Sequence, residues 1–341
     1  MKKTLISVVQ IAVTIAVLWL VFHDPDKRAQ MADALLKADY PWLLGAIFFY
    51  LLVEVAAAAR WHVLLKVQGI NLTIPRVTGL FFIGMFFNQF LPGGTGGDIV
   101  KSYYLLKETT AKAGALLAVL FDRLIGLVAL VTITAALILV RYHWLAQTNQ
   151  TRNYLWFVLL ILSGCVAALV TTFLISGFNL ASRLPNEFPA REKLIEISAA
   201  YHLYARHWTG SLVAFALSLV AHLATFFTFL FVAYTLRANV RLLDFFAVMP
   251  IERTISAIPI SFAGEGPREH VLQVMLSGLC GIAPGVAALI GTMSFLVILL
   301  CSAPGGIIYL FYKPSGVTAP VKLSEMKREV ATAEHEIPEP Q

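Results

Sequence analysis

Long apolar stretches dominate this sequence and restrict what the chain can fold into. Such runs extend, for example, from Leu5 to Phe22 and from Val158 to Ile175. A helix needs roughly 20 residues to cross the hydrocarbon core of a bilayer, and these runs approach that length. Only 13% of the residues are charged, about half the share found in soluble domains, so a polar surface cannot cover these runs. We therefore expect an all-α integral membrane protein.

Six full transmembrane helices are predicted from hydropathy, at residues 4–22, 41–59, 113–140, 154–178, 210–236 and 285–312. The first follows Lys2 and Lys3 and lacks a small-residue cleavage site, so we interpret it as an uncleaved span. Two stretches between spans, 27–38 and 187–208, have amphipathic patterns that predict helices at the membrane interface. The tail, 313–341, is rich in proline and charge and is predicted to be disordered and cytoplasmic.

Two further apolar stretches, 76–112 and 242–283, contain glycine and proline near their middles. The first is interrupted at residues 91–98 and the second at 259–267. Non-helical backbone is tolerated at membrane depth only where protein or a water-filled cavity satisfies its amides. We therefore predict a re-entrant helical hairpin at each place, in addition to the full spans.

The distribution of Lys and Arg predicts the orientation of the chain. If the N-terminus is cytoplasmic, the inner segments hold 16 of the 26 basic residues and the outer segments hold 7, while Arg123, Arg253 and Arg268 lie in the membrane region. Cytoplasmic loops carry an excess of Lys and Arg. Both termini are therefore predicted to be cytoplasmic, in a multi-pass protein of the cell membrane.

This orientation makes the first hairpin enter from the cytoplasm and the second from outside. Each half then consists of two spans, a hairpin and a further span, in opposite orientations. Inverted repeats of this kind recur in transporters. We predict one membrane domain, 1–312, with repeat 1 at about 1–140 and repeat 2 at about 154–312.

The turn of the first hairpin combines groups suited to an anion. Its sequence is Asn88-Gln89-Phe90-Leu91-Pro92-Gly93-Gly94-Thr95-Gly96-Gly97-Asp98. Glycines let the backbone approach a ligand closely, and a helix start attracts anions such as a lipid phosphate. Asp98 is predicted to be the N-cap of the following helix, and Lys101 adds a positive charge one turn later. The plainer interpretation is that Gly and Pro only form the turn and that Asp98 only caps the helix.

Charged residues also mark the second hairpin. Glu252 and Arg253 lie in an apolar stretch, and the turn is Ser261-Phe262-Ala263-Gly264-Glu265-Gly266-Pro267-Arg268-Glu269-His270. Pro267 suits the first position of a helix with Gly266 as its cap, so a second helix start is predicted to point inward. Arg268 is a candidate for binding phosphate, because its planar fork matches phosphate oxygens. Glu265 or Glu269 would hold Arg268 or contact an amine headgroup.

Asp122 and Arg123 lie about ten residues into the third span, close to the bilayer centre by the rise of a helix. Each costs about 2.5–3.5 kcal/mol or more if left to lipid, so both require partners or water. Neighbours in a helix point about 100° apart, and we expect partners elsewhere, with Arg253 and Glu252 as first candidates. Such pairs would either tie the two halves together or belong to a functional site, which is the default hypothesis for intramembrane charges.

Three other polar residues have plainer interpretations. Glu54 and Arg60 lie near the inner end of the second span and are predicted to snorkel toward the interface, with Arg60 as part of an interfacial anchor. His222 lies mid-span among apolar residues. It is predicted to be a hydrogen-bonded core histidine and not a ligand or proton relay.

The motifs, taken together and in order, resemble a known family. They are Asn88-x-x-Leu91-Pro92-Gly93-Gly94-x-Gly96-Gly97-Asp98, Asp122-Arg123-x-x-Gly126, Glu252-Arg253 and Gly264-x-Gly266-x-x-Glu269. The set resembles the transmembrane flippase domain of the lysylphosphatidylglycerol synthase/flippase family, over nearly the whole chain up to Tyr312. The resemblance implies movement of a polar-headed lipid between leaflets. Full-length members carry an aminoacyl-transferase domain after the membrane part, and this chain has a short tail, so neither lysyl transfer nor an aminoacylated lipid is implied.

The predicted substrate-binding residues are Asn88, Gly93, Gly94, Gly96, Gly97, Asp98, Lys101, Asp122, Arg123, Glu252, Arg253, Glu265, Arg268 and Glu269. The expected ligand is a membrane lipid whose phosphate lies between the two helix starts. No catalytic residue, metal or cofactor is predicted, because the sequence contains no Cys-x-x-Cys and no Walker loop. Scattered basic residues argue against nucleic acid. A second copy of the chain or a lipid-synthesis enzyme is a candidate protein partner.

Two other functions stay open from the sequence. One is a membrane-embedded lipid-modifying enzyme, a phosphatase or glycosyl transferase, with Asp98, Asp122 or Glu265 as acid or base. The other is an accessory subunit of a lipid-synthesis machinery, which would tolerate neutral residues at the intramembrane charges. For a transporter, phospholipids, polyprenyl-phosphate carriers and hopanoid-type lipids fit the motifs equally well.

Overall fold

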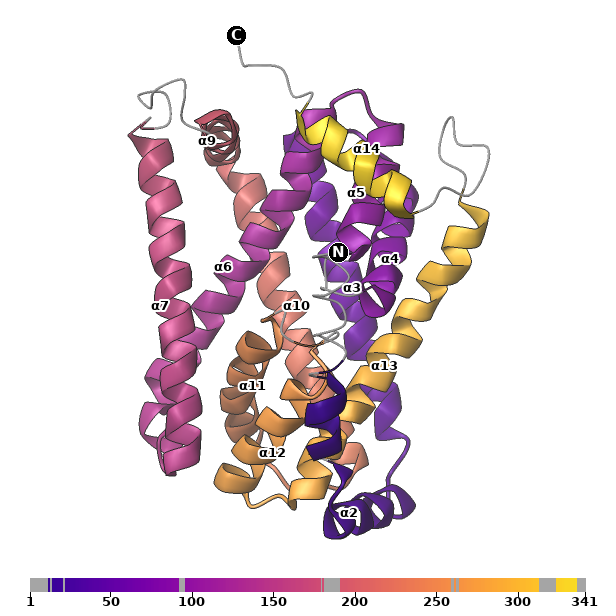
Figure 1. Cartoon of the computed structure of the whole chain (residues 1–341), viewed down its shortest axis with the longest axis vertical. Coiled ribbons are helices and arrows are strands. Elements are labelled where there is room, and N and C mark those ends of the chain that lie inside the picture. The colour runs from indigo at the N-terminus through magenta and orange to yellow at the C-terminus, as the bar shows by residue number, and fades with distance from the viewer. Residues whose placement is uncertain are drawn as a thin grey trace.

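The computed structural model describes residues 12, 14–20, 22–91, 96–178, 180, 191–258, 261, 264–312 and 323–335. The regular elements in these ranges are α-helices (Figure 1). Five of them are long and apolar enough to cross a membrane: α3 (Trp42–Val67), α6 (Lys112–Leu145), α7 (Asn149–Gly177), α10 (Trp208–Thr235) and α13 (Pro284–Phe311). They confirm an all-α membrane protein and match five of the predicted spans. About half of the first predicted span, 4–22, lies outside the described residues, and residues 14–20 within it are helical.

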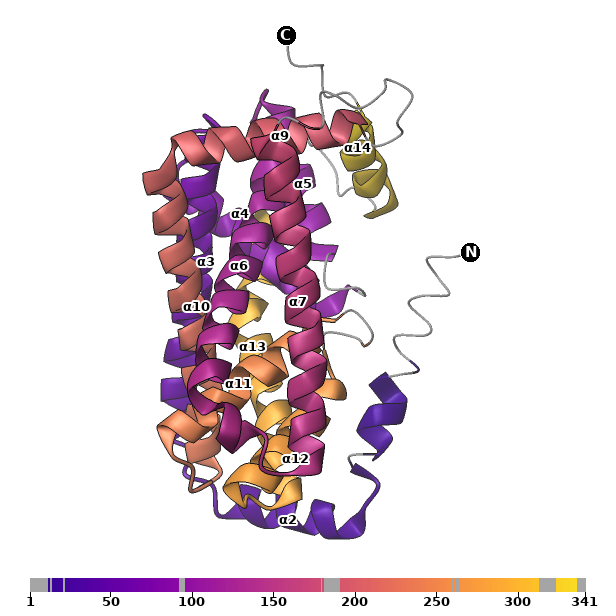
Figure 2. The ribbon, with the colours of Figure 1, turned by 90° about the vertical axis from the view of Figure 1, so that its left-hand side faces the viewer.

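The long helices run along the long axis of the molecule (Figures 1 and 2). α3 and α10 pack against each other through aromatic rings, with the rings of Phe49 and Phe227 stacked 4.7 Å apart. A side chain at Gly45 would overlap the ring of Phe231, so glycine is what allows this close approach. The α3–α10 pair therefore forms a firm contact between the first and second halves of the chain.

Two pairs of shorter helices lie between the long ones, at the positions where hairpins are predicted. α4 (Ile74–Phe90) and α5 (Gly96–Glu108) lie in the upper half of Figure 1, and α11 (Leu242–Ser256) and α12 (Pro267–Cys280) lie in the lower half. Their 13 to 17 residues span roughly 20–25 Å at the rise of an α-helix. That is less than the roughly 30 Å core of a bilayer. Their insertion into a membrane as re-entrant hairpins stays a prediction.

The two halves share an order of elements. α3 is followed by the α4–α5 pair and α6, and α10 is followed by the α11–α12 pair and α13. The short pairs lie toward opposite ends of the molecule (Figure 1). This is the arrangement that an inverted repeat requires, and the repeat itself stays a prediction.

Short helices cross the two ends of the bundle. α2 (Pro25–Leu36) lies at one end and α9 (Arg191–Arg206) at the other (Figure 2). α2 overlaps the predicted amphipathic stretch 27–38, and α9 lies within the predicted stretch 187–208. The prediction of a wholly disordered tail is wrong for α14 (Leu323–His335), which packs on α5. Met326 and Val330 are buried there, because their spacing of four residues places both on one face of the helix.

Candidate functional site

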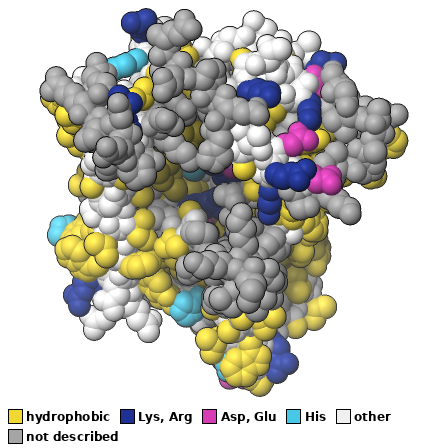
Figure 3. Space-filling model, turned by 45° about the horizontal axis from the view of Figure 1, so that its top comes forward, with side chains coloured by type: hydrophobic (Ala, Val, Ile, Leu, Met, Phe, Trp, Pro, Cys, Tyr) yellow, Lys and Arg dark blue, Asp and Glu magenta, His cyan; other side chains and the backbone are white. Residues whose placement is uncertain are grey.

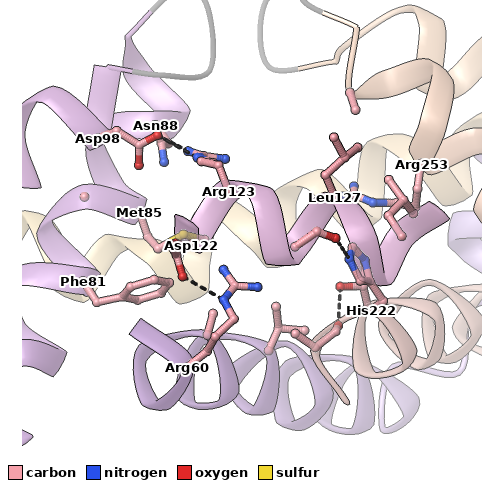
Figure 4. Close-up of a pocket in the computed structure, with 18 of the residues that line it drawn as sticks. Arg60, Phe81, Met85, Asn88, Asp98, Asp122, Arg123, Leu127, His222 and Arg253 are labelled. Atoms are coloured by element: carbon pink, nitrogen blue, oxygen red, sulfur yellow. Dashed lines mark hydrogen bonds and ion pairs between the residues drawn. The ribbon is translucent and has the colours of Figure 1, made fainter. Parts of the chain in front are cut away.

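A cavity of about 340 Å³ lies between the two halves of the protein (Figure 4). Its walls come from α3, α4, α5 and α6 of the first half and from α10 and α11 of the second. The charged and polar residues that line it are Arg60, Asn88, Asp98, Lys101, Asp122, Arg123, His222, Thr225 and Arg253. Figure 3 shows a hollow with Lys or Arg atoms inside it on the face that is turned forward. Six of the predicted site residues thus meet in one place.

Asp122 is held by two cations of the first half. Arg60 Nε donates to Asp122 Oδ1 at 2.7 Å, and Lys101 Nζ lies 3.6 Å from Asp122 Oδ2. The side chain of Arg60 is 12% exposed, and its Nη1 also donates to Ser218 of α10 at 3.0 Å. The prediction that Arg60 snorkels to the interface is therefore wrong. Because α3 continues as a helix past residue 59, Asp122 can hold the guanidinium inside the protein.

Arg123 and Asp98 form a second ion pair on the cavity wall. Arg123 Nε donates to Asp98 Oδ2 at 2.7 Å, and Lys101 Nζ lies 3.7 Å from Asp98 Oδ1. The prediction that Asp98 is an N-cap is wrong, because α5 begins at Gly96 and Asp98 lies in its first turn. A carboxylate in this position still interacts favourably with the positive end of the helix dipole.

Lys101 links the two ion pairs. Its side chain is buried between Asp98 and Asp122, and its Nζ lies 4.5 Å from the centre of the Trp61 ring and 5.4 Å from that of Phe81. Aromatic faces attract cations, so the ammonium is stabilised from four directions. The predicted cation one turn into α5 is present, and its charge is shared by two carboxylates.

The expected pairing of Asp122 and Arg123 with Arg253 and Glu252 is not what the structure has. Adjacent residues on α6 point about 100° apart: Asp122 faces α3, and Arg123 faces α5. The first half therefore compensates these charges internally. At the cavity, the halves are linked by hydrogen bonds from Arg60 to Ser218 and between His222 Nε2 and the carbonyl oxygen of Gly126 at 3.1 Å. Farther along α6, Arg141 forms an ion pair with Asp244 of α11.

The second half contributes His222 and Arg253 to the cavity. The prediction that His222 is hydrogen-bonded is confirmed by its bond to Gly126. Arg253 is half-buried and makes no ion pair with a carboxylate among the residues that the structure describes. With Arg60, Lys101 and Arg123, it gives four cations against two carboxylates on the cavity walls. The cavity thus has a net positive charge and suits an anion.

Two glycines of the first turn, Gly96 and Gly97, lie within the described residues, and both allow helices to pack closely. Gly97 N donates to Asn88 Oδ1 at 2.9 Å, and a methyl group at Gly97 would overlap the carbonyl of Gly84 on α4. Gly96 and Gly97 thereby allow α5 to lie against α4, and neither lines the cavity. Gly93 and Gly94 lie outside the described residues.

The remaining predicted residues form a separate buried group. Glu252, Glu265, Arg268 and Glu269 do not line the cavity. Arg268 Nη1 donates to Glu265 Oε1, and Arg268 Nε lies 3.9 Å from Glu252 Oε1. Pro267 begins α12 after Gly266, as predicted. The structure thus places Arg268 with carboxylates and away from the cavity cations.

No group of three or more His, Cys, Asp or Glu side chains within the described ranges is arranged to hold a metal ion. The cavity itself is lined by four cations, two carboxylates and the polar side chains of Asn88, His222 and Thr225. Asp98 and Asp122, the carboxylates on its walls, are both engaged by cations. Such an arrangement is electrostatically suited to an anionic group.

The fold and the cavity define a polytopic all-α membrane protein with a charged chamber between its halves. Residues 7–305 match the family described as the lysylphosphatidylglycerol synthase TM region. The chain belongs to this family, which confirms the resemblance seen in its motifs.

Two curated relatives share part of this sequence. A UPF0104 membrane protein of Pyrococcus horikoshii is 28% identical over 134 residues, which are 38% of this chain and 38% of that protein. A UPF0104 membrane protein of Methanocaldococcus jannaschii is 24% identical over 126 residues, or 36% of each chain. The matched segments thus span well under half of either relative.

Proposed function

We propose that this protein moves a lipid with a polar, phosphate-containing headgroup between the two leaflets of the cell membrane. The observation that carries the proposal is the net positive cavity between the two halves, with Arg253 on its wall and no carboxylate paired to that arginine among the described residues. A headgroup phosphate is an anion of the right kind for such a guanidinium.

The physical barrier to lipid flipping explains why such a cavity is useful. A charged group at the centre of a bilayer is strongly unfavourable because lipid tails offer neither counter-charges nor hydrogen bonds. The walls of the cavity supply both, at positions fixed by the Asp98–Arg123 and Arg60–Asp122 pairs. A headgroup that enters the cavity therefore replaces its interactions with water by interactions with cationic side chains that are already in position.

An apolar groove beside the cavity supports a lipid over a soluble anion. Two adjoining apolar cavities of about 680 and 420 Å³ lie along α6 and α7, and both are lined by Phe121, Leu124 and Tyr201. Leu127 lines both the smaller of these cavities and the charged one. In Figure 1, α6 diverges from α7 toward the end that carries α9. The groove thus offers hydrocarbon chains a place next to the headgroup cavity.

An enzymatic role receives less support from these contacts. Asp98 and Asp122 are held by Arg123, Arg60 and Lys101, and a carboxylate held in this way is a poor acid or base.

In the proposed orientation, the end that carries α9 and α14 faces the cytoplasm, as the excess of Lys and Arg there favours.

The direct test is flipping by the purified protein in proteoliposomes, with leaflet-specific labelling of anionic, zwitterionic and isoprenoid-linked lipids. The variant is Arg253→Gln, and the control is Arg152→Gln, which changes an exposed arginine near the start of α7. A hydrogen bond to a charged group contributes about 1.5–3 kcal/mol, so Arg253→Gln should slow flipping of an anionic lipid by about 10- to 100-fold. Wild-type protein that accelerates no lipid in this set would refute the proposal.

A further inference from the structure

The buried group formed by Glu252, Glu265, Arg268 and Glu269 has no role in headgroup binding and lies apart from the cavity. We call it the carboxylate cluster. Relative exposures are 0% for Glu252, 8% for Glu265, 4% for Arg268 and 0% for Glu269. It joins α11 to the start of α12. Charged groups this deeply buried are rare unless they are paired.

The contacts of the cluster form a continuous chain. Ser256 Oγ donates to Glu252 Oε1 at 2.7 Å, and Arg268 bridges Glu252 and Glu265. Glu269 Oε2 accepts from the backbone N–H of Gly266 at 2.7 Å. One end of this chain is Ser256, next to Ala257 on the cavity wall. The other end is Glu265, whose side chain is 10% exposed.

Two carboxylate oxygens of the cluster are left without hydrogen bonds. They are Glu252 Oε2 and Glu269 Oε1, both buried. Glu269 Oε1 faces α13, where a Cβ atom at Gly291 would lie 3.1 Å away. An unsatisfied buried acceptor costs about 1–3 kcal/mol, and more when it is charged. These oxygens therefore point to a ligand that removes charge or supplies a donor.

The charges of the cluster do not balance. Three carboxylates face one guanidinium, which leaves an excess of two negative charges if all are ionised. The other members of the cluster are the charged groups with the largest effects on Glu265 and Glu269. An excess of this size is costly in a low-dielectric interior, which favours uptake of positive charge by the cluster.

The helices around the cluster, within the described ranges, contribute aromatic rings and one further carboxylate. α13 contributes the ring of Phe295, which lies 5.5 Å from the Arg268 guanidinium, and has no charged residue. α3 carries the buried Tyr50 and, one turn later, Glu54, a buried carboxylate whose two oxygens also lack hydrogen bonds. α7 presents Tyr154, whose ring lies 6.3 Å from that of His270. On the other side of α11, α10 presents His222, which is bonded to Gly126.

The ligand that fits is a proton. A hard metal cation takes about six or more oxygen ligands, whereas no metal-binding group of side chains occurs within the described ranges. A proton on Glu252 or Glu269 removes one negative charge and turns an acceptor into a donor. Glu265, whose side chain is 10% exposed, is the member of the cluster through which that proton would exchange with solvent.

We propose that the carboxylate cluster is a proton-binding site and that one proton moves with each lipid headgroup, in the same direction. This rests on the proposed lipid transport. Glu252 and Arg253 are neighbours on α11, one in the cluster and one on the cavity wall. Moving a proton with an anionic headgroup reduces the net charge that crosses the membrane, which lowers the electrostatic barrier.

The protonated carboxyl can be detected without any lipid substrate. Infrared difference spectra of the purified protein, recorded across a pH titration, should contain the carbonyl band of a buried protonated carboxyl. Glu252→Gln and Glu269→Gln should each remove part of that band, whereas Glu325→Gln, on the exposed face of α14, should leave it unchanged. A spectrum in which neither cluster variant alters this band would overturn the proton site.

The coupling is tested by the steady-state distribution of a labelled anionic lipid in proteoliposomes with an imposed pH gradient. One proton per lipid should enrich the lipid about tenfold per pH unit in the leaflet facing the more alkaline side, and Glu252→Gln should abolish the enrichment. An even distribution despite rapid flipping, or enrichment by a sodium gradient alone, would overturn the coupling. No flipping under any gradient would refute the transport function instead, and the infrared spectra would still decide whether protons bind.

Discussion

Replacing Asp122 by leucine tests whether the cavity charges hold the protein together. Asp122 is 3% exposed and lies against Arg60 and Lys101. Asp122→Leu leaves these two cations with Asp98 as the remaining carboxylate on the cavity wall. Removing one partner of a buried ion pair costs about 3–5 kcal/mol, so we expect the free energy of unfolding to fall by that amount.

The double variant Arg60→Met/Asp122→Leu separates the loss of the pair from the exposure of an uncompensated charge. Replacement of a whole buried ion pair by apolar residues of similar size is often neutral or stabilising. We therefore expect the double variant to recover most of the lost stability, with a coupling energy of up to about 3 kcal/mol in the mutant cycle.

Reversible unfolding in mixed detergent micelles measures the free energies of the four proteins in this cycle. A cost of less than about 1 kcal/mol for Asp122→Leu, the value of an exposed ion pair, would refute the reasoning. So would strictly additive effects of the two single substitutions. If the double variant is stable but flips no lipid, then Arg60 or Asp122 contributes to transport as well as to stability.

Three further predictions concern packing. Gly164→Leu fills part of the apolar groove, where a Cβ meets no atom within 4 Å, and should therefore slow lipid flipping. Its thermal stability should be unchanged or raised, because leucine favours helix by up to about 1 kcal/mol relative to glycine. The control, Gly177→Leu, should not slow flipping. Gly97→Ala should destabilise the protein by about 1–3 kcal/mol by overpacking, measured as unfolding free energy, while Gly79→Ala should not. Glu329→Ala, which removes the ion pair between α14 and α5, should change stability by less than about 1 kcal/mol.

The positions of the helices follow from the sequence because they depend on local properties. Gly and Pro at 91–98 and 259–267 interrupt apolar stretches, and the short helix pairs lie on both sides of these interruptions. α14 was missed because the proline and charge of the tail conceal an amphipathic pattern. The buried face of α14 becomes visible only when α5 is there to cover it.

The contacts of the site were harder to predict because they depend on how helices pack. The sequence singled out Asp122 and Arg123 as needing partners, and both have them. It assigned the wrong partners, since nothing local indicates that α3 continues past residue 59 and brings Arg60 to the depth of Asp122. Arg60 could have been found by asking which other cation the extended helix carries into the membrane.

The adjacency of Glu252 and Arg253 on α11 joins the carboxylate cluster to the cavity wall through a single helical turn. The two side chains point about 100° apart, so any twist of this turn displaces both by the same angle. Pro250 precedes them within the helix and cannot donate a backbone hydrogen bond, which weakens the helix directly beside the pair. A movement of this turn that displaces the guanidinium of Arg253 in the cavity would therefore also displace the carboxylate of Glu252 in the cluster.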